Sequence, residues 1–87
     1  MNVWETTILK AYQANNGSAS NTEIYDLIKQ FIALSPEHLR PTVYGGRPAY
    51  VHQVRSHITN LSQSGDLRQL GRGLYELTLK GRRGLVP

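Results

Sequence analysis

Residues 50–79 decide the fold, and they read Tyr50-Val51-His52-Gln53-Val54-Arg55-Ser56-His57-Ile58-Thr59-Asn60-Leu61-Ser62-Gln63-Ser64-Gly65, then Asp66-Leu67-Arg68-Gln69-Leu70, then Gly71-Arg72-Gly73, then Leu74-Tyr75-Glu76-Leu77-Thr78-Leu79. We expect a helix that begins near Pro48 and ends before Gly65, with a buried stripe made of Val51, Val54, Ile58 and Leu61. Apolar residues on both sides of a Gly-Arg-Gly turn then predict a β-hairpin with strands containing Leu67, Leu70, Tyr75, Leu77 and Leu79. The turn tolerates positive φ and projects Arg72 from the hairpin tip.

Two helices are predicted ahead of this stretch. The first covers about Val3 to Ala14, and its apolar stripe consists of Trp4, Ile8, Ala11 and Tyr12. The second begins at a capping box, in which Ser20 and Glu23 each satisfy an amide of the other. It is expected to run to about Ala33, with a stripe of Ile24, Leu27, Ile28 and Phe31. The predicted fold class is therefore mainly α with a small β-hairpin, namely a winged helix-turn-helix of three helices plus a wing.

The connection between the second and third helices is longer than a minimal helix-turn-helix requires. Ser35-Pro36 predicts a single helical turn, which Pro41 ends. The sequence from Thr42 to Arg47 then predicts a flexible segment with a tyrosine, Tyr44, and an arginine beside a Gly-Gly pair. Long loops in compact domains are usually functional or mobile. Two interpretations stay open here, an extra DNA-contacting element and a tolerated surface insertion.

Positive charge gathers in the second half of the chain. Residues 1–43 hold three basic and four acidic residues, a net charge of −1, whereas residues 44–87 hold seven basic and two acidic residues, a net charge of +5. Most of these basic residues are arginines, whose planar guanidinium suits phosphates and guanine edges. The basic half coincides with the helix and the hairpin, which favours nucleic acid as the partner.

The polar side of the third helix has the composition of a surface that reads bases. Opposite the aliphatic stripe lie short neutral donors and acceptors rather than solubilising charges, and Arg55 lies on the flank. Glutamine and asparagine can pair bidentately with adenine, and histidine or serine can reach several base edges. The candidate DNA-binding residues are Tyr44, Arg47, Tyr50, His52, Gln53, Arg55, Ser56, Asn60, Arg68 and Arg72.

Length and composition exclude several classes of protein. A chain of 87 residues makes one domain, has little room for an enclosed catalytic cleft and contains no cysteine. We find no metal-ligand set, no nucleophilic constellation and no cofactor motif, so we predict no catalytic residue, cofactor or metal and expect that this domain alone is not an enzyme. No segment resembles a membrane span or signal peptide, which favours the cytoplasm. The domain is expected over residues 1–84, and residues 85–87 resemble the start of a protease-cleavage linker.

The chain resembles winged helices that accompany restriction endonucleases. The residues that carry this resemblance are Val54-Arg55, Ile58, Leu61, Gly65, Leu67, Gly71-x-Gly73 and Tyr75-x-Leu77. They are similar to the Mrr-type amino-terminal domains and to the carboxy-terminal winged helix of the endonuclease that cuts adenine-methylated GATC sites. The resemblance implies binding of duplex DNA, a fused nuclease domain and, as in some of these domains, a preference for methylated adenine. The groups available to contact an added methyl group near the third helix are Tyr44, Ala49 and Tyr50.

Two other classes share this fold. A transcriptional regulator would be expected to dimerise and bind a palindrome, but we see no separate dimerisation helix. A protein-interaction winged helix often lacks basic residues on its third helix and wing, whereas Arg55, Arg68 and Arg72 are present here. The preferred hypothesis is a sequence-reading duplex DNA-binding module, the recognition domain of a larger restriction-type endonuclease.

Overall fold

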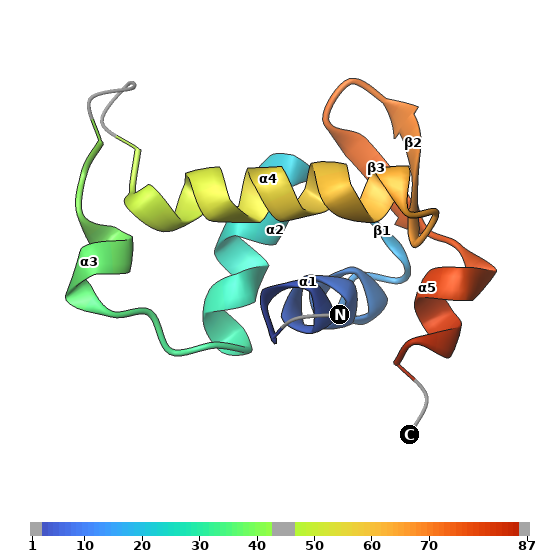
Figure 1. Ribbon diagram of the computed structural model, residues 1–87, viewed down its shortest axis with the longest axis horizontal. Helices are drawn as coiled ribbons and strands as arrows, with labels where there is room; N and C mark the ends of the chain where they lie inside the picture. Colours follow the sequence, from blue (N-terminus) through green and yellow to red (C-terminus); the bar gives the residue numbers. More distant parts are fainter. Residues whose placement is uncertain (1–2, 43–46, 86–87) are drawn as a thin grey trace.

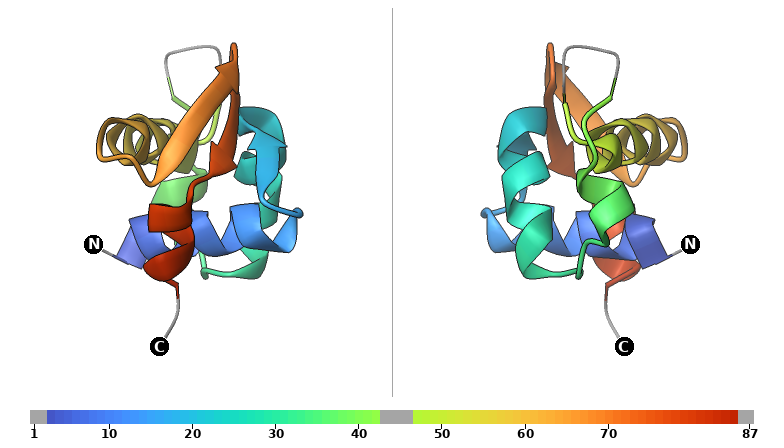
Figure 2. Two further views of the ribbon diagram at one scale, coloured as in Figure 1. Left: turned by 90° about the vertical axis from the view of Figure 1, so that its right-hand side faces the viewer. Right: turned by 90° about the vertical axis from the view of Figure 1, so that its left-hand side faces the viewer.

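The computed structural model describes residues 3–42 and 47–85 and confirms a mainly helical winged-helix architecture. Along the chain lie α1 (Val3–Ala14), β1 (Ser18–Ser20), α2 (Asn21–Leu27), the 3-10 turn η1 (Ile28–Gln30), α3 (Pro36–Leu39), α4 (Ala49–Gln63), β2 (Leu67–Gly71), β3 (Leu74–Leu77) and α5 (Leu79–Arg83). In Figure 1, α4 crosses above α1, α2 lies beside both, and the β2–β3 hairpin rises at the carboxyl end of α4. The turned views of Figure 2 place α1 and α5 at the base, away from the hairpin tip.

The core lies where α1, α2 and α4 meet the sheet. It contains the stripe predicted for the third helix and, from the first, Ile8, Ala11 and Tyr12, while Trp4 packs against it only partly buried. The strands add Ala19, Leu67 and Leu77. Its largest fully buried side chains are Tyr12, Ile8, Leu9, Ile24, Ile28, Ile58, Leu61, Leu67 and Val54. Because α4 contributes three of these residues to the core, its orientation is fixed by packing, and its opposite side must face outward.

The hairpin is part of a three-stranded antiparallel sheet in the order β1-β3-β2. Leu67 pairs with Leu77, and Ala19 of β1 pairs with Tyr75. The register of β2 shifts between Gln69 and Gly71, so a bulge precedes the tip. At the tip Gly73 has a φ of +68°, which favours glycine and confirms the predicted turn. The sequence analysis did not identify β1, whose three residues tie the α1–α2 connection to the hairpin.

The second helix begins as predicted and ends earlier. The Glu23 amide donates to Ser20 Oγ at 3.2 Å, and the Ser20 amide donates to Glu23 Oε1 at 3.0 Å, which completes the capping box. The hydrogen bond from the Ser20 amide to the Glu23 carboxylate, followed by those from the Ser20 and Asn15 side chains, lowers the pKa of Glu23. The prediction that the helix reaches Ala33 is wrong, because η1 ends at Gln30 and the chain then turns. Phe31 is consequently exposed, whereas Ile32 packs partly against the core.

The connection to α4 contains the predicted single turn and is tied at both ends. Ser35 caps α3 by accepting from the His38 amide at 3.3 Å. Beyond it, the Ala49 amide donates to the Arg40 carbonyl at 2.9 Å, and the Thr42 amide donates to the Arg47 carbonyl at 2.9 Å. The ends of the segment predicted to be flexible are therefore held together by backbone hydrogen bonds. Residues 43–46, including Tyr44, lie outside the described residues.

The end of the hairpin differs from the prediction. We expected the second strand to include Leu79, but β3 ends at Leu77, and Leu79 is exposed in the first turn of α5. Thr78 Oγ1 accepts from the Gly81 amide at 3.1 Å and so caps this short helix. A Cβ on Gly81 would lie 2.3 Å from the Asp66 carbonyl oxygen, so α5 can approach the backbone just before β2 only with glycine there. Leu85, just past α5, packs partly against the core.

Candidate nucleic-acid interface

The outward side of α4 carries most of the polar residues that the sequence analysis selected. We call the exposed residues on this side the α4 outer face: His52, Gln53, Ser56 and Asn60. Thr42 Oγ1 lies 3.2 Å from His52 Nε2 and itself donates to the Arg47 carbonyl at 2.9 Å, so this face is joined to the segment before the helix. The helix therefore presents short hydrogen-bonding groups on a rigid support.

Tyr50 does not belong to this surface. It is 2 % exposed, and its hydroxyl donates to the Tyr25 carbonyl at 2.9 Å, a contact between α4 and α2. Tyr50 lies four residues before Val54 and so continues the buried row of the helix. Its ring and hydroxyl are both used inside the domain, so this placement does not support its predicted contact with DNA.

Arg47, Arg55 and Arg72 line one hollow between α2, α4 and the hairpin. Arg47 comes just before α4, Arg55 lies on the helix, and Arg72 lies at the hairpin tip. The hollow has a volume of about 520 Å³, and its other lining residues are Asn21, Thr22, Tyr25, Thr59, Gln69, Gly73 and Tyr75. We call it the arginine hollow. The structure thus brings together three arginines that are far apart in the sequence.

The wall of the arginine hollow is polar and positively charged. Its lining residues include three arginines and no aspartate or glutamate. Burial raises the pKa of Tyr25, on the α2 side of the hollow, and this effect outweighs the nearby charges of Arg55 and Arg47, which lower it. The phenol hydroxyl of Tyr25 is a hydrogen-bond donor. A surface with this charge and these donors suits an anion.

Arg68 lies apart from the hollow. Successive side chains of a strand point to opposite faces, so Arg68 projects from the other face of the sheet than Gln69, which lines the hollow. Its guanidinium pairs with Glu76, the residue opposite it in register on β3. Of the two hairpin arginines, only Arg72 joins Arg47 and Arg55.

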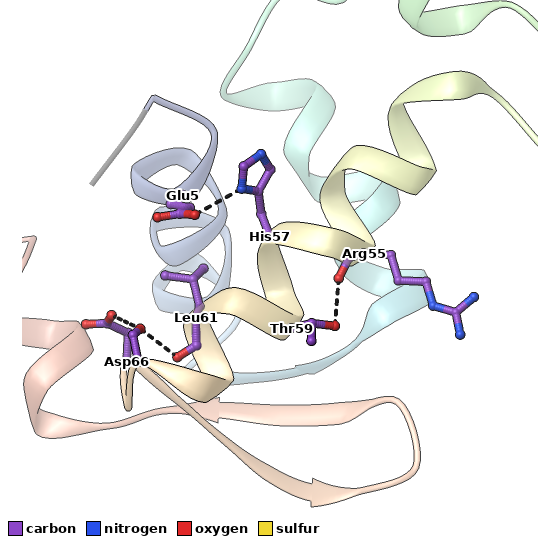
Figure 3. A network of polar contacts seen from close by, with 7 residues as sticks. Glu5, Arg55, His57, Thr59, Leu61 and Asp66 are labelled. Atoms are coloured by element: carbon purple, nitrogen blue, oxygen red, sulfur yellow. Dashed lines mark hydrogen bonds and ion pairs between the residues drawn. The ribbon is translucent and has the colours of Figure 1, made fainter.

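His57 and Arg55 project from different sides of α4, as Figure 3 shows. His57 points toward α1, where its Nδ1 lies 3.0 Å from Glu5 Oε2, and its ring stacks on Trp4 with centroids 6.5 Å apart. Arg55 points away from this pair, and its carbonyl accepts from Thr59 Oγ1 at 3.2 Å. His57 thus fixes α4 to α1, while Arg55 stays at the outer surface.

The sequence analysis missed the side chains that α2 and the strands supply to the hollow. Asn21, Thr22 and Tyr25 gave no local signal, because polar residues on the outer side of an amphipathic helix are common. Thr59 and Gln69 adjoin residues that were selected, and helical or strand periodicity alone does not show which neighbour they face. Asn21 Oδ1 is buried and has no hydrogen-bond partner among the described residues, so this wall has an acceptor available for a ligand or water.

The described part of the chain gives no sign of two other kinds of site. Within residues 3–42 and 47–85, no three histidine, cysteine, aspartate or glutamate side chains are placed so that they could hold a metal ion. Among the same residues, no helix is long and apolar enough to cross a bilayer.

Three helices, a hairpin and a basic surface between the third core helix and the hairpin define a winged-helix domain. Residues 4–86 match the Mrr N-terminal domain, and the chain belongs to that family. The family is associated with Mrr restriction endonucleases, in which this domain is typically a non-catalytic part. No curated protein and no solved structure matches the chain significantly.

Proposed function

We propose that this domain binds duplex DNA, reads part of its sequence and serves as the recognition domain of a larger restriction-type endonuclease acting in the cytoplasm. The observation that carries the proposal is the gathering of three arginines in one hollow beside the α4 outer face. In the proposed complex α4 enters the major groove, and the hairpin tip approaches the phosphate backbone or the minor groove. The domain's place in the Mrr N-terminal family supports the endonuclease context.

Binding to random duplex at increasing salt tests the proposal directly. A protein that neutralises phosphates releases counterions, so its affinity falls steeply with salt concentration. We expect such a fall for this domain. An affinity for random duplex that is undetectable at low salt would contradict DNA binding and would favour a protein-interaction winged helix instead.

The first prediction concerns the hairpin tip. Arg72 is exposed between two glycines, which allow close approach to a phosphate backbone. Arg72→Ala is expected to weaken binding to all duplexes similarly and to reduce the slope of log affinity against log salt by about one. Fluorescence anisotropy at several salt concentrations measures both quantities. Arg68→Ala is the matched control on the same hairpin, and an unchanged slope in Arg72→Ala would show that the tip does not bind phosphate.

The second prediction concerns base reading by the α4 outer face. Gln53 is exposed near the start of α4, and a bidentate glutamine–adenine pair discriminates between bases by about 1–3 kcal/mol. Gln53→Ala is expected to relax the preference at one base pair and to leave binding to random duplex nearly unchanged. Competition between a selected duplex and its single-base variants measures this. Equal binding of all duplexes by the unaltered domain would mean that α4 does not read sequence.

A preference for methylated adenine is the finer part of the proposal, and its support is the resemblance to methyladenine-dependent endonucleases. Contact with an added methyl group needs an apolar surface beside the bases. Tyr50 is buried, so Ala49, half-buried at the first position of α4, is the described candidate for that contact. Adding methylated and unmethylated duplexes of the same sequence to the competition assay decides this point, and equal affinity for the two would contradict it.

A further inference from the structure

We propose that the arginine hollow is a phosphate site formed before DNA binds, and that in the DNA complex it holds one phosphodiester of the backbone. This inference rests on the proposed binding of duplex DNA and deepens it. It predicts that one linkage in the bound duplex matters far more than its neighbours, because three guanidinium groups share it. General attraction by scattered surface charges would make no single linkage stand out.

The fold itself positions the three arginines of the hollow. The lining arginines come from three separate parts of the chain: the segment just before α4, the helix itself and the hairpin tip. Each part is held by a contact outside the hollow. The Thr42 amide donates to the Arg47 carbonyl at 2.9 Å, the core fixes α4, and β1 pairs with β3 behind the tip. The backbone positions of the three arginines are therefore set by the fold rather than by a ligand.

The positive charge of the arginine hollow has no carboxylate beside it among the lining residues. Glu76 pairs instead with Arg68 on the other face of the same hairpin. Guanidinium groups brought together without a counter-charge repel one another, and an anion between them removes that repulsion. Hydrogen bonds from guanidinium to phosphate are charge-assisted and often bidentate. The hollow therefore has the charge and the donors that a phosphate group requires.

The lining of the arginine hollow suits a phosphate group better than a nucleobase. An unstacked base would need an apolar or aromatic wall on which to stack. The wall is instead mostly polar, and of its two tyrosines Tyr25 is only 9 % exposed and Tyr75 is partly buried against the core. Threonine, asparagine and glutamine side chains complete the lining. The volume of about 520 Å³ leaves room for a water molecule beside the phosphate. Such a water molecule can donate a hydrogen bond to the buried acceptor Asn21 Oδ1.

The test replaces single backbone phosphates of the duplex by neutral methylphosphonates, one position at a time. We expect one linkage at which the replacement weakens binding by at least roughly tenfold, since hydrogen bonds to charged groups are individually strong. In Arg55→Ala the same replacement should cost clearly less than in the unaltered domain, because one of the three guanidinium partners of that phosphate is already missing. Arg68→Ala removes the same charge outside the hollow and should retain the full tenfold sensitivity.

A second arm uses inorganic phosphate without DNA, at constant ionic strength maintained with chloride. Amide resonances of Thr59, Gln69 and Gly73, which line the hollow, should shift with phosphate, and these shifts should disappear in Arg55→Ala. Deoxynucleoside monophosphate is titrated in parallel. Coupling between one linkage and Arg55 identifies the backbone as the source of the phosphate, whereas localised shifts without such coupling identify a free phosphate ligand.

The outcomes separate this inference from the proposed function. Binding of duplex with no linkage that couples to Arg55, together with no localised shift with phosphate, would overturn the inference and leave DNA binding intact. Failure of the domain to bind duplex would overturn the proposed function. In that case the inorganic phosphate arm alone decides whether the arginine hollow is a phosphate site.

Discussion

Ile58→Ala is expected to lower the free energy of unfolding by about 2–5 kcal/mol, as large-to-small changes in well-packed cores do. Ile58 is 1 % exposed and lies in the middle of the buried side of α4, beside α1. A chain of 87 residues has a total stability of only about 4–13 kcal/mol, so this single change removes a large part of it. Urea unfolding followed by circular dichroism measures the loss.

Two further variants serve as controls for the loss of unfolding free energy in Ile58→Ala. Ile58→Val removes one methyl group and should cost about 0.5–1.5 kcal/mol. Gln53→Ala, on the exposed side of the same helix, should change the free energy of unfolding by less than about 0.5 kcal/mol. Equal effects for Ile58→Ala and Gln53→Ala would mean that α4 does not pack in the orientation described, and the assignment of its outer face would fail with it.

The helices and the hairpin could be predicted because their signals are local. The α4 stripe repeats at helical spacing, Ser20 and Glu23 form a capping box, and a Gly-Arg-Gly turn separates two apolar runs. Each signal acts within a few residues, and the structure confirms each one. Tyr50 also had a readable signal, since it lies four residues before Val54 on the buried row, but its tyrosine chemistry suggested a surface role.

The elements that were missed depend on distant partners. Ser18–Ser20 is too short to show an alternating pattern and is a strand because it pairs with β3. Thr78 follows β3 and caps α5, which approaches the Asp66 backbone closely only because Gly81 lacks a Cβ. The arginine hollow is the same kind of feature. Arg47, Arg55 and Arg72 meet only after the sheet and α2 are in place, and sequence spacing says nothing about that meeting.

The triple variant Arg47→Ala, Arg55→Ala, Arg72→Ala is expected to lose roughly 100-fold in affinity for duplex DNA at about 150 mM salt. Each positive charge brought to the backbone contributes about 0.9 to the salt slope by releasing counterions, and the three arginine charges gathered around the held phosphodiester account for about 2.7. Extrapolated from 1 M salt to physiological salt, that slope corresponds to a loss of roughly two orders of magnitude. Anisotropy titrations across salt concentrations give the affinity and the slope in one experiment.

The matched control removes three positive charges from the opposite side of the domain, in the variant Lys10→Ala, Lys80→Ala, Arg83→Ala. These residues are exposed on α1 and α5, and Figure 2 places those helices at the base of the domain, away from the hairpin tip. The control has the same net charge as the hollow variant. If net charge alone governs binding, the two variants lose equal affinity. A loss confined to the hollow variant, with its slope reduced by about three, shows that the position of the arginines matters, because counterion release requires contact with phosphates.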